Sequence, residues 1–160
     1  MASIQKYRSS FGHFALAFVA ATCLFSNAIA HPQTEEESRE RIQKLISKTF
    51  DRPDLKVQTD PIVIEGKVAI ADWIQGEKGG RALLTRKHVD WEIIACGGAG
   101  FKDPSVIAAS GISKRIANNI TEKLKTAEAK LPPQKVKQLD SFDGVVTMGR
   151  NSRHEPKVKH

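Results

Sequence analysis

Apolar and polar residues follow a regular strand-like pattern in the middle of the chain, between Val68 and Gly98. Three runs rich in β-branched, aliphatic and aromatic residues lie there, at 68–75, 81–87 and 91–96. A glycine-containing stretch at 76–80 separates the first two runs, and His88-Val89-Asp90 separates the last two. Connections of this length and composition are typical of hairpins. The pattern therefore predicts an antiparallel meander on which the rest of the chain packs.

Strict alternation predicts which residues share a face of each strand. In the first run, one face receives Val68, Ile70, Asp72 and Ile74, and the other receives Ala69, Ala71 and Trp73. Both sets are mostly apolar, so we expect both faces to be at least partly covered. In the third run, alternation groups Trp91, Ile93 and Ala95 against Glu92, Ile94 and Cys96. An earlier strand contains Pro61, which cannot donate a ladder hydrogen bond, and is therefore expected to be short, kinked or at an edge.

The flanking segments read as helices. Thr34 and Glu37 match a capping box that begins an amphipathic helix ending near Phe50. Asp103 begins a short helix, and Ser113 caps a longer one that ends at Pro132-Pro133. A weakly amphipathic segment at 134–140 and a last strand at 144–148 follow. The order predicts an α+β fold with an N-terminal helix, a curved antiparallel sheet of four to five strands and two C-terminal helices, the helices covering one face. Nuclear transport factor-like and cystatin-like cones are the nearest analogies at the level of fold.

The N-terminus has the pattern of a secretory signal. Lys6 and Arg8 precede an apolar run at 14–25, and Ala28-Ile29-Ala30 matches a cleavage site. We therefore expect three parts: a cleaved signal peptide at 1–30, one α+β domain at 31–148 and a disordered basic tail at 149–160. Loss of Lys6 and Arg8 lowers the formal net charge from +7 to +5. The expected location is the periplasm.

Composition and motifs exclude several classes of function. The chain has no basic stripe interleaved with aromatic residues, so nucleic acid is not an expected partner. It contains no nucleophile elbow, phosphate loop, dinucleotide fingerprint, His-Glu-x-x-His or Cys-x-x-Cys motif. After cleavage the chain is not expected to span a membrane. These observations favour a protein that is not an enzyme.

Two carboxylates on the meander leave alternatives open. Asp72 lies among aliphatic residues, so its carboxylate must be hydrogen-bonded, paired or placed at a pocket mouth. A bond to a backbone amide, to Arg81 or to Arg86 is the simpler interpretation, and a functional acid is the other. Asp72 with Glu92 is a candidate acid/base pair, although nothing in the sequence fixes their separation.

Binding of a soft metal ion is the remaining candidate function. Thiolate, thioether and imidazole ligands select copper, particularly Cu(I). The candidate ligands in the expected mature chain are His31, Cys96, Met148, His154 and His160, with His88 in a turn. Cys96 is expected to be buried and outside any disulfide, because Cys23 leaves with the signal. We expect any copper to be held mainly by the termini, through His31 and the segment with Met148, His154 and His160.

Three stretches carry a family resemblance. They are residues 71–98 (ADWIQGEKGGRALLTRKHVDWEIIACGG), Lys102-Asp103, and residues 139–146 (LDSFDGVV). Over residues 42–148 the chain resembles the copper uptake system-associated proteins, which are small exported bacterial proteins found beside copper import components. The resemblance implies a periplasmic role in copper acquisition, and it supplies no ligand set. His88-Val89-Asp90 stands where a glycine-containing turn is expected, and the Met- and His-rich motif of dedicated periplasmic copper chaperones is absent.

Three hypotheses of function follow. The first is an accessory protein of copper uptake that binds a copper ion weakly or contacts copper import components of the cell envelope. The second is a non-catalytic module that binds a small ligand in a cone-shaped apolar pocket near Trp73 and Trp91. The third is a hydrolase or isomerase that uses Asp72 or Glu92.

Overall fold

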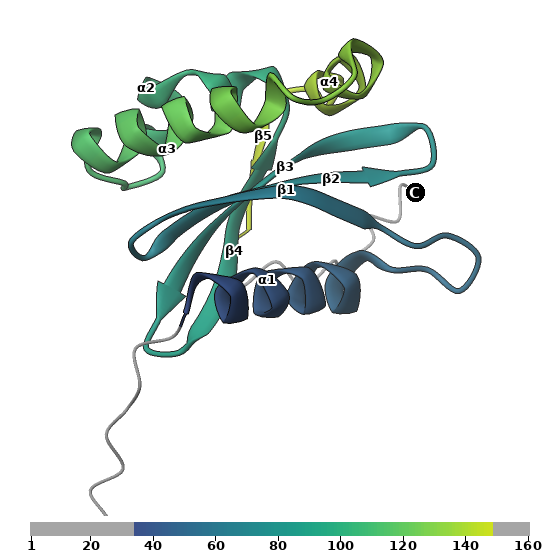
Figure 1. Ribbon diagram of the computed structural model, residues 1–160, viewed down its shortest axis with the longest axis horizontal. Helices are drawn as coiled ribbons and strands as arrows, with labels where there is room; N and C mark the ends of the chain where they lie inside the picture. The colour runs from purple at the N-terminus through teal and green to yellow at the C-terminus, as the bar shows by residue number, and fades with distance from the viewer. Residues whose placement is uncertain (1–33, 149–160) are drawn as a thin grey trace, which may run out of the picture. The chain divides into compact units, whose positions relative to one another are not determined.

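A computed structural model describes residues 34–148 of the chain, all of which belong to one compact unit, Pro32–His160. Its elements are shown in Figure 1. In chain order they are α1 (Glu35–Phe50), β1 (Gln58–Glu65), β2 (Val68–Gln75), β3 (Lys78–Lys87), β4 (Asp90–Gly97), the 3₁₀ turn η1 (Ala99–Lys102), α2 (Pro104–Ala109), α3 (Lys114–Glu128), α4 (Pro133–Asp140) and β5 (Val145–Thr147). The predicted α+β class is confirmed.

The five strands form one antiparallel sheet in the order β1-β2-β3-β4-β5. The predicted meander is therefore confirmed, with β5 added beside β4. The strand that contains Pro61 is β1, which lies at an edge of the sheet as expected. Its pairing register with β2 shifts between Thr59 and Ile62, because Pro61 lacks the N–H that a regular ladder needs.

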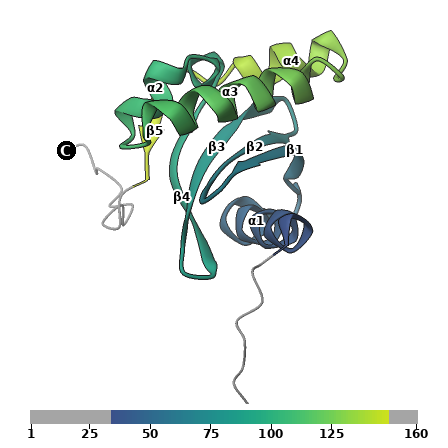
Figure 2. The ribbon, with the colours of Figure 1, turned by 60° about the vertical axis from the view of Figure 1, so that its left-hand side comes forward.

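Helices cover both faces of the sheet, which corrects the expectation that they cover one face. In Figures 1 and 2, α1 lies on one side of the sheet, and α2, α3 and α4 lie on the other. The physical reason is visible in β2, whose residues are mostly apolar on both faces of the sheet. Each face must therefore be shielded from water by a helix. The core on the α1 side contains Ile42, Ile46, Ala69, Ala71, Leu84, Trp91 and Ile93. The core on the α3 side contains Ile70, Leu83, Phe101, Ile107, Ile120 and Leu124.

A β-bulge in β4 corrects the predicted face of Cys96. Leu83 pairs with Ala95 and Leu84 pairs with Ile93, so Ile94 is an extra residue opposite β3. One inserted residue reverses the alternation beyond it. Cys96 consequently lies in the α1-side core with Trp91 and Ile93, while Ala95 lies in the α3-side core.

The ends of the helices follow the predicted capping residues. Glu37 N–H donates to Thr34 Oγ1 at 3.2 Å, and Thr34 N–H donates to Glu37 Oε2 at 3.0 Å, which completes the capping box of α1. Asp103 and Ser113 cap α2 and α3. In the β3–β4 turn, His88 has φ +55°, the left-handed conformation that a glycine would adopt more readily.

After α4 the chain crosses the end of the sheet from the α3 side to the α1 side. We call residues 140–144 the strap: it begins at Asp140, the last residue of α4, and leads to β5. The strap lies directly on a glycine of β3 and on Gly98, which follows the end of β4. A Cβ on Gly98 would come within 2.3 Å of the Phe142 carbonyl oxygen, and one on Gly80 within 3.1 Å of Phe142 Cβ. Two of the glycines in the stretches that carry the family resemblance therefore seat the strap.

Candidate functional site

A pocket of about 290 Å³ opens on the α1 side of the sheet, next to the end of α1. It is lined by Phe50, Trp73, Gln75, Cys96, Phe142, Val146 and Met148. Apolar and aromatic side chains with a few polar or reactive groups are the usual lining of a small-ligand site. Both sulfur-bearing residues of the predicted ligand set that the structure describes are part of this lining.

The β4–β5 register brings Cys96 and Met148 to this pocket. Cys96 pairs with Val146, and Met148 lies two residues further along the chain, on the same side as Val146. Met148 N–H also donates to the Ile94 carbonyl at 2.8 Å, which continues the ladder. Diagonal neighbours of this kind are within reach of a long, flexible side chain. The two sulfur atoms can therefore approach one ligand from adjacent strands.

Burial controls the chemistry of the Cys96 thiol. Cys96 is 6% exposed and forms no disulfide, as predicted. Burial raises the pKa of Cys96 to about 11, so the group is a thiol at neutral pH. A buried thiol of this kind is a weak nucleophile, and it becomes a thiolate only when a cation displaces its proton.

The aromatic walls of the pocket are held in place by neighbouring groups. Trp73 and Phe142 meet edge to face, with ring centroids 6.0 Å apart and an interplanar angle of 83°. The missing side chain of Gly80 makes room for both rings, since a Cβ there would lie 2.9 Å from Trp73 Cζ2. Gln75 Nε2 donates to the carbonyl oxygens of Phe50 at 2.8 Å and Leu55 at 3.0 Å, which ties β2 to the end of α1.

The other predicted site residues do not join this pocket. His31, His154 and His160 lie outside the described residues. His88 is in the β3–β4 turn, and Trp91 lines a separate shallow pocket beside α1, so the two tryptophans do not share a cavity as hypothesised. Within residues 34–148 there is no group of three or more His, Cys, Asp or Glu side chains that could hold a metal ion.

Sequence reasoning missed Phe50, Gln75, Phe142 and Val146 as lining residues. Phe50 and Gln75 are the last residues of α1 and β2, and Phe142 and Val146 lie in the strap and β5. These segments are distant in sequence and come together only in the folded chain. The available signal was residues 139–146, which belong to the stretches that carry the resemblance. The sequence pattern predicts only a weakly amphipathic segment followed by a strand in this part of the chain.

A cluster of buried charges lies on the opposite face, beneath α3 and α4. Arg81, fully buried, pairs across the strands with Asp72, whose Oδ1 lies 3.6 Å from Arg81 Nε. Arg81 Nε donates to Glu128 Oε1 at 2.6 Å, and Arg81 Nη2 donates to Asp140 Oδ1 at 2.8 Å. Lys102 reaches the same two carboxylates, at 3.3 Å and 2.8 Å. Of the alternatives for Asp72, pairing with Arg81 is the one observed.

Asp72 holds a proton in this cluster. Burial and, next, the negative charge of Glu128 raise the pKa of Asp72 to about 8, against the opposing positive charge of Arg81. Neither Asp72 oxygen accepts a hydrogen bond, whereas a protonated Asp72 can donate one to Glu128. With that proton, Arg81 and Lys102 balance the charges of Glu128 and Asp140. The cluster is therefore neutral overall at pH 7.

The structure does not bring Asp72 and Glu92 together as an acid/base pair. Asp72 pairs with Arg81 and Glu92 pairs with Thr85, four residues further along β3. At about 3.3 Å per residue, the two positions are about 13 Å apart along the sheet. Glu92 instead pairs with Lys87 at 2.6 Å.

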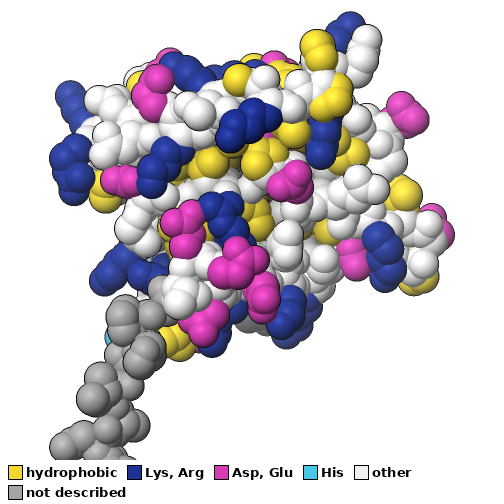
Figure 3. Space-filling view, in the orientation of Figure 1, with side chains coloured by type: hydrophobic (Ala, Val, Ile, Leu, Met, Phe, Trp, Pro, Cys, Tyr) yellow, Lys and Arg dark blue, Asp and Glu magenta, His cyan; other side chains and the backbone are white. Residues whose placement is uncertain are grey.

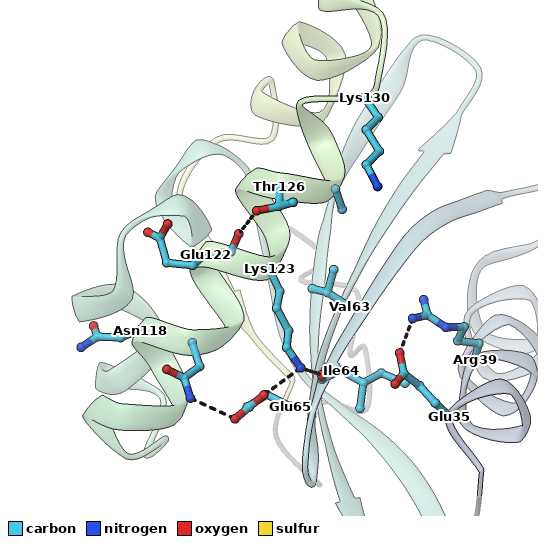
Figure 4. Close-up of a pocket in the computed structure, with 12 residues that line it drawn as sticks. Glu35, Arg39, Val63, Ile64, Glu65, Asn118, Glu122, Lys123, Thr126 and Lys130 are labelled. Carbon is cyan, nitrogen blue, oxygen red and sulfur yellow. Dashed lines mark hydrogen bonds and ion pairs between the residues drawn. The ribbon is translucent and has the colours of Figure 1, made fainter.

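An open groove of about 610 Å³ runs along the outer edge of β1, between α1 and α3 (Figure 4). Several of its charged side chains are bonded to one another or to the edge of the strand. Lys123 Nζ donates to the Ile64 carbonyl at 2.7 Å and pairs with Glu65 at 2.8 Å, and Arg39 donates to the Ile62 carbonyl. These bonds occupy backbone acceptors that another strand would need, so the groove protects an exposed sheet edge.

Among the described residues, the face shown in Figure 3 has no single-sign charged patch that would indicate a partner. Acidic and basic side chains are interspersed on the face shown in Figure 3. No helix in residues 34–148 is long and apolar enough to cross a membrane.

The chain matches no protein-family model, and no curated protein or solved structure is significantly similar to it.

Proposed function

We propose that this protein is a non-catalytic, periplasmic accessory protein of copper uptake that carries Cu(I) between Cys96 and Met148. The supporting observation is that a thiol and a thioether line the same apolar pocket. Sulfur ligands of these two kinds favour Cu(I) over harder cations. The resemblance to copper uptake system-associated proteins points to the same cargo. Contact with copper import components of the cell envelope belongs to the proposal, because the cargo must be passed on.

The state of Cys96 makes this binding readily reversible. Copper must displace the thiol proton, and with a pKa of about 11 this lowers the apparent affinity at pH 7 by about 10,000-fold relative to a free thiolate. The affinity should therefore rise about tenfold for each unit of pH between 6 and 9. Modest affinity at neutral pH suits a protein that releases its cargo to a partner.

The terminal histidines remain a competing source of ligands. His31, His154 and His160 were predicted to hold copper with Met148. Imidazole must be neutral to bind a metal, so a histidine site should lose affinity below about pH 6.5 and change little above it. The pH dependence of the affinity therefore distinguishes a Cys96 site from a terminal histidine site.

The test is an anaerobic competition titration of Cu(I) against a chromogenic chelator between pH 6 and 9. The mature chain is compared with C96A, M148L and a chain that ends at Met148. We expect one Cu(I) per chain, a loss of at least 100-fold in C96A, a loss of about tenfold in M148L, and little change when residues 149–160 are removed. Full affinity in C96A would refute the proposal. A large loss on removing 149–160 would transfer the site to the tail.

A second candidate is an apolar small ligand in the same pocket, favoured by the lining of Phe50, Trp73 and Phe142. The M148L variant separates the two, because this exchange keeps the volume and apolar character of the side chain but removes the sulfur. An apolar ligand should bind M148L as well as the wild type, with fluorescence of an apolar dye as the measurement. Cu(I) binding should be weakened.

A further inference from the structure

The strap physically joins the buried charge cluster to the sulfur pocket. Asp140, its first residue, accepts hydrogen bonds from Arg81 Nη2 and from Lys102 Nζ, both at 2.8 Å. Arg81 Nη1 also donates to the Leu139 carbonyl at 3.2 Å. Two residues after Asp140, Phe142 forms part of the pocket wall. The strap therefore begins in the charge cluster on the α3 side and ends in the pocket on the α1 side.

Asp140 is held firmly. Arg81 is fully buried and also bonded to Glu128, so its guanidinium has a fixed position. Burial alone would raise the pKa of Asp140, but the hydrogen bonds from Lys102 and Arg81 outweigh it and hold this pKa below its usual value. Asp140 is thus ionised at neutral pH and paired with two cations, which is the strong form of a hydrogen bond.

The strap also lies very close to Gly98, which follows the end of β4. The carbonyl oxygens of Asp140 and Phe142 lie 2.9 Å and 2.3 Å from where a Cβ on Gly98 would be. This contact is possible only because residue 98 has no side chain. A strap released from Arg81 and Lys102 would lose the anchor that keeps it in this contact.

Three of the seven lining residues depend on this segment for their position: Phe142, Val146 and Met148. Val146 lies in β5 and Met148 directly follows it; this strand is only three residues long and lies at the edge of the sheet. So short an edge strand has few ladder bonds with which to fix its own position. The hydrogen bonds of Asp140 to Arg81 and Lys102 fix the start of the segment and so help to hold β5 in position.

We infer that Asp140, clamped by Arg81 and Lys102, is a positioning residue of the Cys96–Met148 site, which holds Met148 and Phe142 against Cys96 from the opposite face of the sheet. The inference rests on the proposed function. It predicts that Asp140 affects Cu(I) affinity through the position of Met148. The effects of D140N and M148L on this affinity should therefore not be additive in free energy. A purely structural carboxylate would instead act on folding and on all pocket properties alike.

The test is a double-mutant cycle of D140N and M148L, with Cu(I) affinity at pH 7 measured by anaerobic competition. We expect D140N to weaken binding about tenfold and M148L about tenfold, and the double variant to be no weaker than M148L alone. The matched control is D143N, because Asp143 is an exposed strap residue and the charge change is the same. D143N should bind as the wild type does.

A metal-free measurement accompanies the cycle. Release of the strap should open the pocket wall, so D140N should raise the rate at which a thiol reagent labels Cys96 by severalfold, and D143N should not. Thermal melting of each variant establishes that it is folded. If D140N does not fold, K102Q replaces it, since Lys102 is 28% exposed and its loss leaves Arg81 on Asp140.

The outcomes separate the two proposals. Unchanged affinity and labelling in D140N, with binding that still depends on Cys96 and Met148, would overturn the positioning role alone. Losses that multiply in the double variant would also overturn it, because Asp140 would then act independently of Met148. A wild-type chain that does not bind Cu(I) through Cys96 would overturn the proposed function and this inference with it.

Discussion

The two faces of the sheet are built from neighbouring residues of the same strands, yet they bury opposite chemistry. Asp72 and Arg81 point into a charge cluster under α3 and α4. Their neighbours Trp73 and Gly80 form the apolar pocket on the α1 side. On one face, Arg81 and Lys102 form ion pairs with Glu128 and Asp140. On the other, a thiol and a thioether face a pocket. The difference indicates that the charged face supports the structure and the sulfur face is open to a ligand.

The largest expected effect comes from removing the centre of the charged face. R81M leaves the carboxylates of Glu128 and Asp140 without their buried cation, and breaking a buried pair from one side costs about 3–5 kcal/mol. The free energy of unfolding from urea denaturation measures this. R115M on the exposed side of α3 is the control and should change stability by less than about 0.5 kcal/mol. A small effect of R81M would show that the cluster is not a structural anchor.

A somewhat smaller effect is expected on the α1 face, from Trp91. Trp91 is 7% exposed in the core beside α1, and Arg86 lies 5.6 Å from its ring centroid. W91A should cost about 3 kcal/mol, the lower end for a core tryptophan. Cu(I) affinity of the folded fraction should be unchanged, because the ring is outside the sulfur pocket. Unchanged melting with lost binding would instead place Trp91 in a site.

Counted per pH unit, the smallest effect tests the proton on Asp72. Its pKa is raised above the unfolded value of 3.8 to about 8, so the folded state holds a proton that the unfolded state has lost. The stabilisation is complete below about pH 3.8 and is lost as pH rises towards 8, by at most about 1.4 kcal/mol per pH unit. Urea titrations between pH 5 and 8 should show this fall.

The control for the pH effect is D72N, which cannot titrate and should lose the slope. The carboxylates with lowered pKa values, Glu65, Asp103 and Asp140, contribute a change of the opposite sign, but only as pH falls below their unfolded values near 4. The window from 5 to 8 therefore reports on Asp72. Stability that rises with pH in this window would contradict the assignment.

Local patterns predicted most of the fold because local physics sets them. The capping box at Thr34, the caps at Asp103 and Ser113, and the hairpins of the meander depend on residues within a few positions of one another. Pro61, through its missing donor, predicted that β1 is short, kinked or at an edge, and the structure places it at an edge. The burial of Cys96 followed from its apolar strand and the absence of a partner cysteine in the expected mature chain.

The site depended on contacts that no local pattern contains. The bulge at Ile94 reversed the face of Cys96, and such an insertion is invisible to strict alternation. Phe142 and Met148 reach the pocket only because the strap crosses the end of the sheet. The buried pairing of Arg81 with Asp140 joins residues 59 positions apart.

The sequence by itself determined the α+β class, the antiparallel meander and the types of sulfur ligand the chain can offer, because propensity, periodicity and side-chain chemistry are properties of nearby residues. The tertiary structure decided that helices cover both faces, that Cys96 meets Met148 in one pocket, and that Asp72 shares a buried cluster with Arg81 and Glu128. These features depend on the pairing register of the strands and on the path of the strap across the end of the sheet. A shift of one residue in the register moves a side chain to the other face of the sheet.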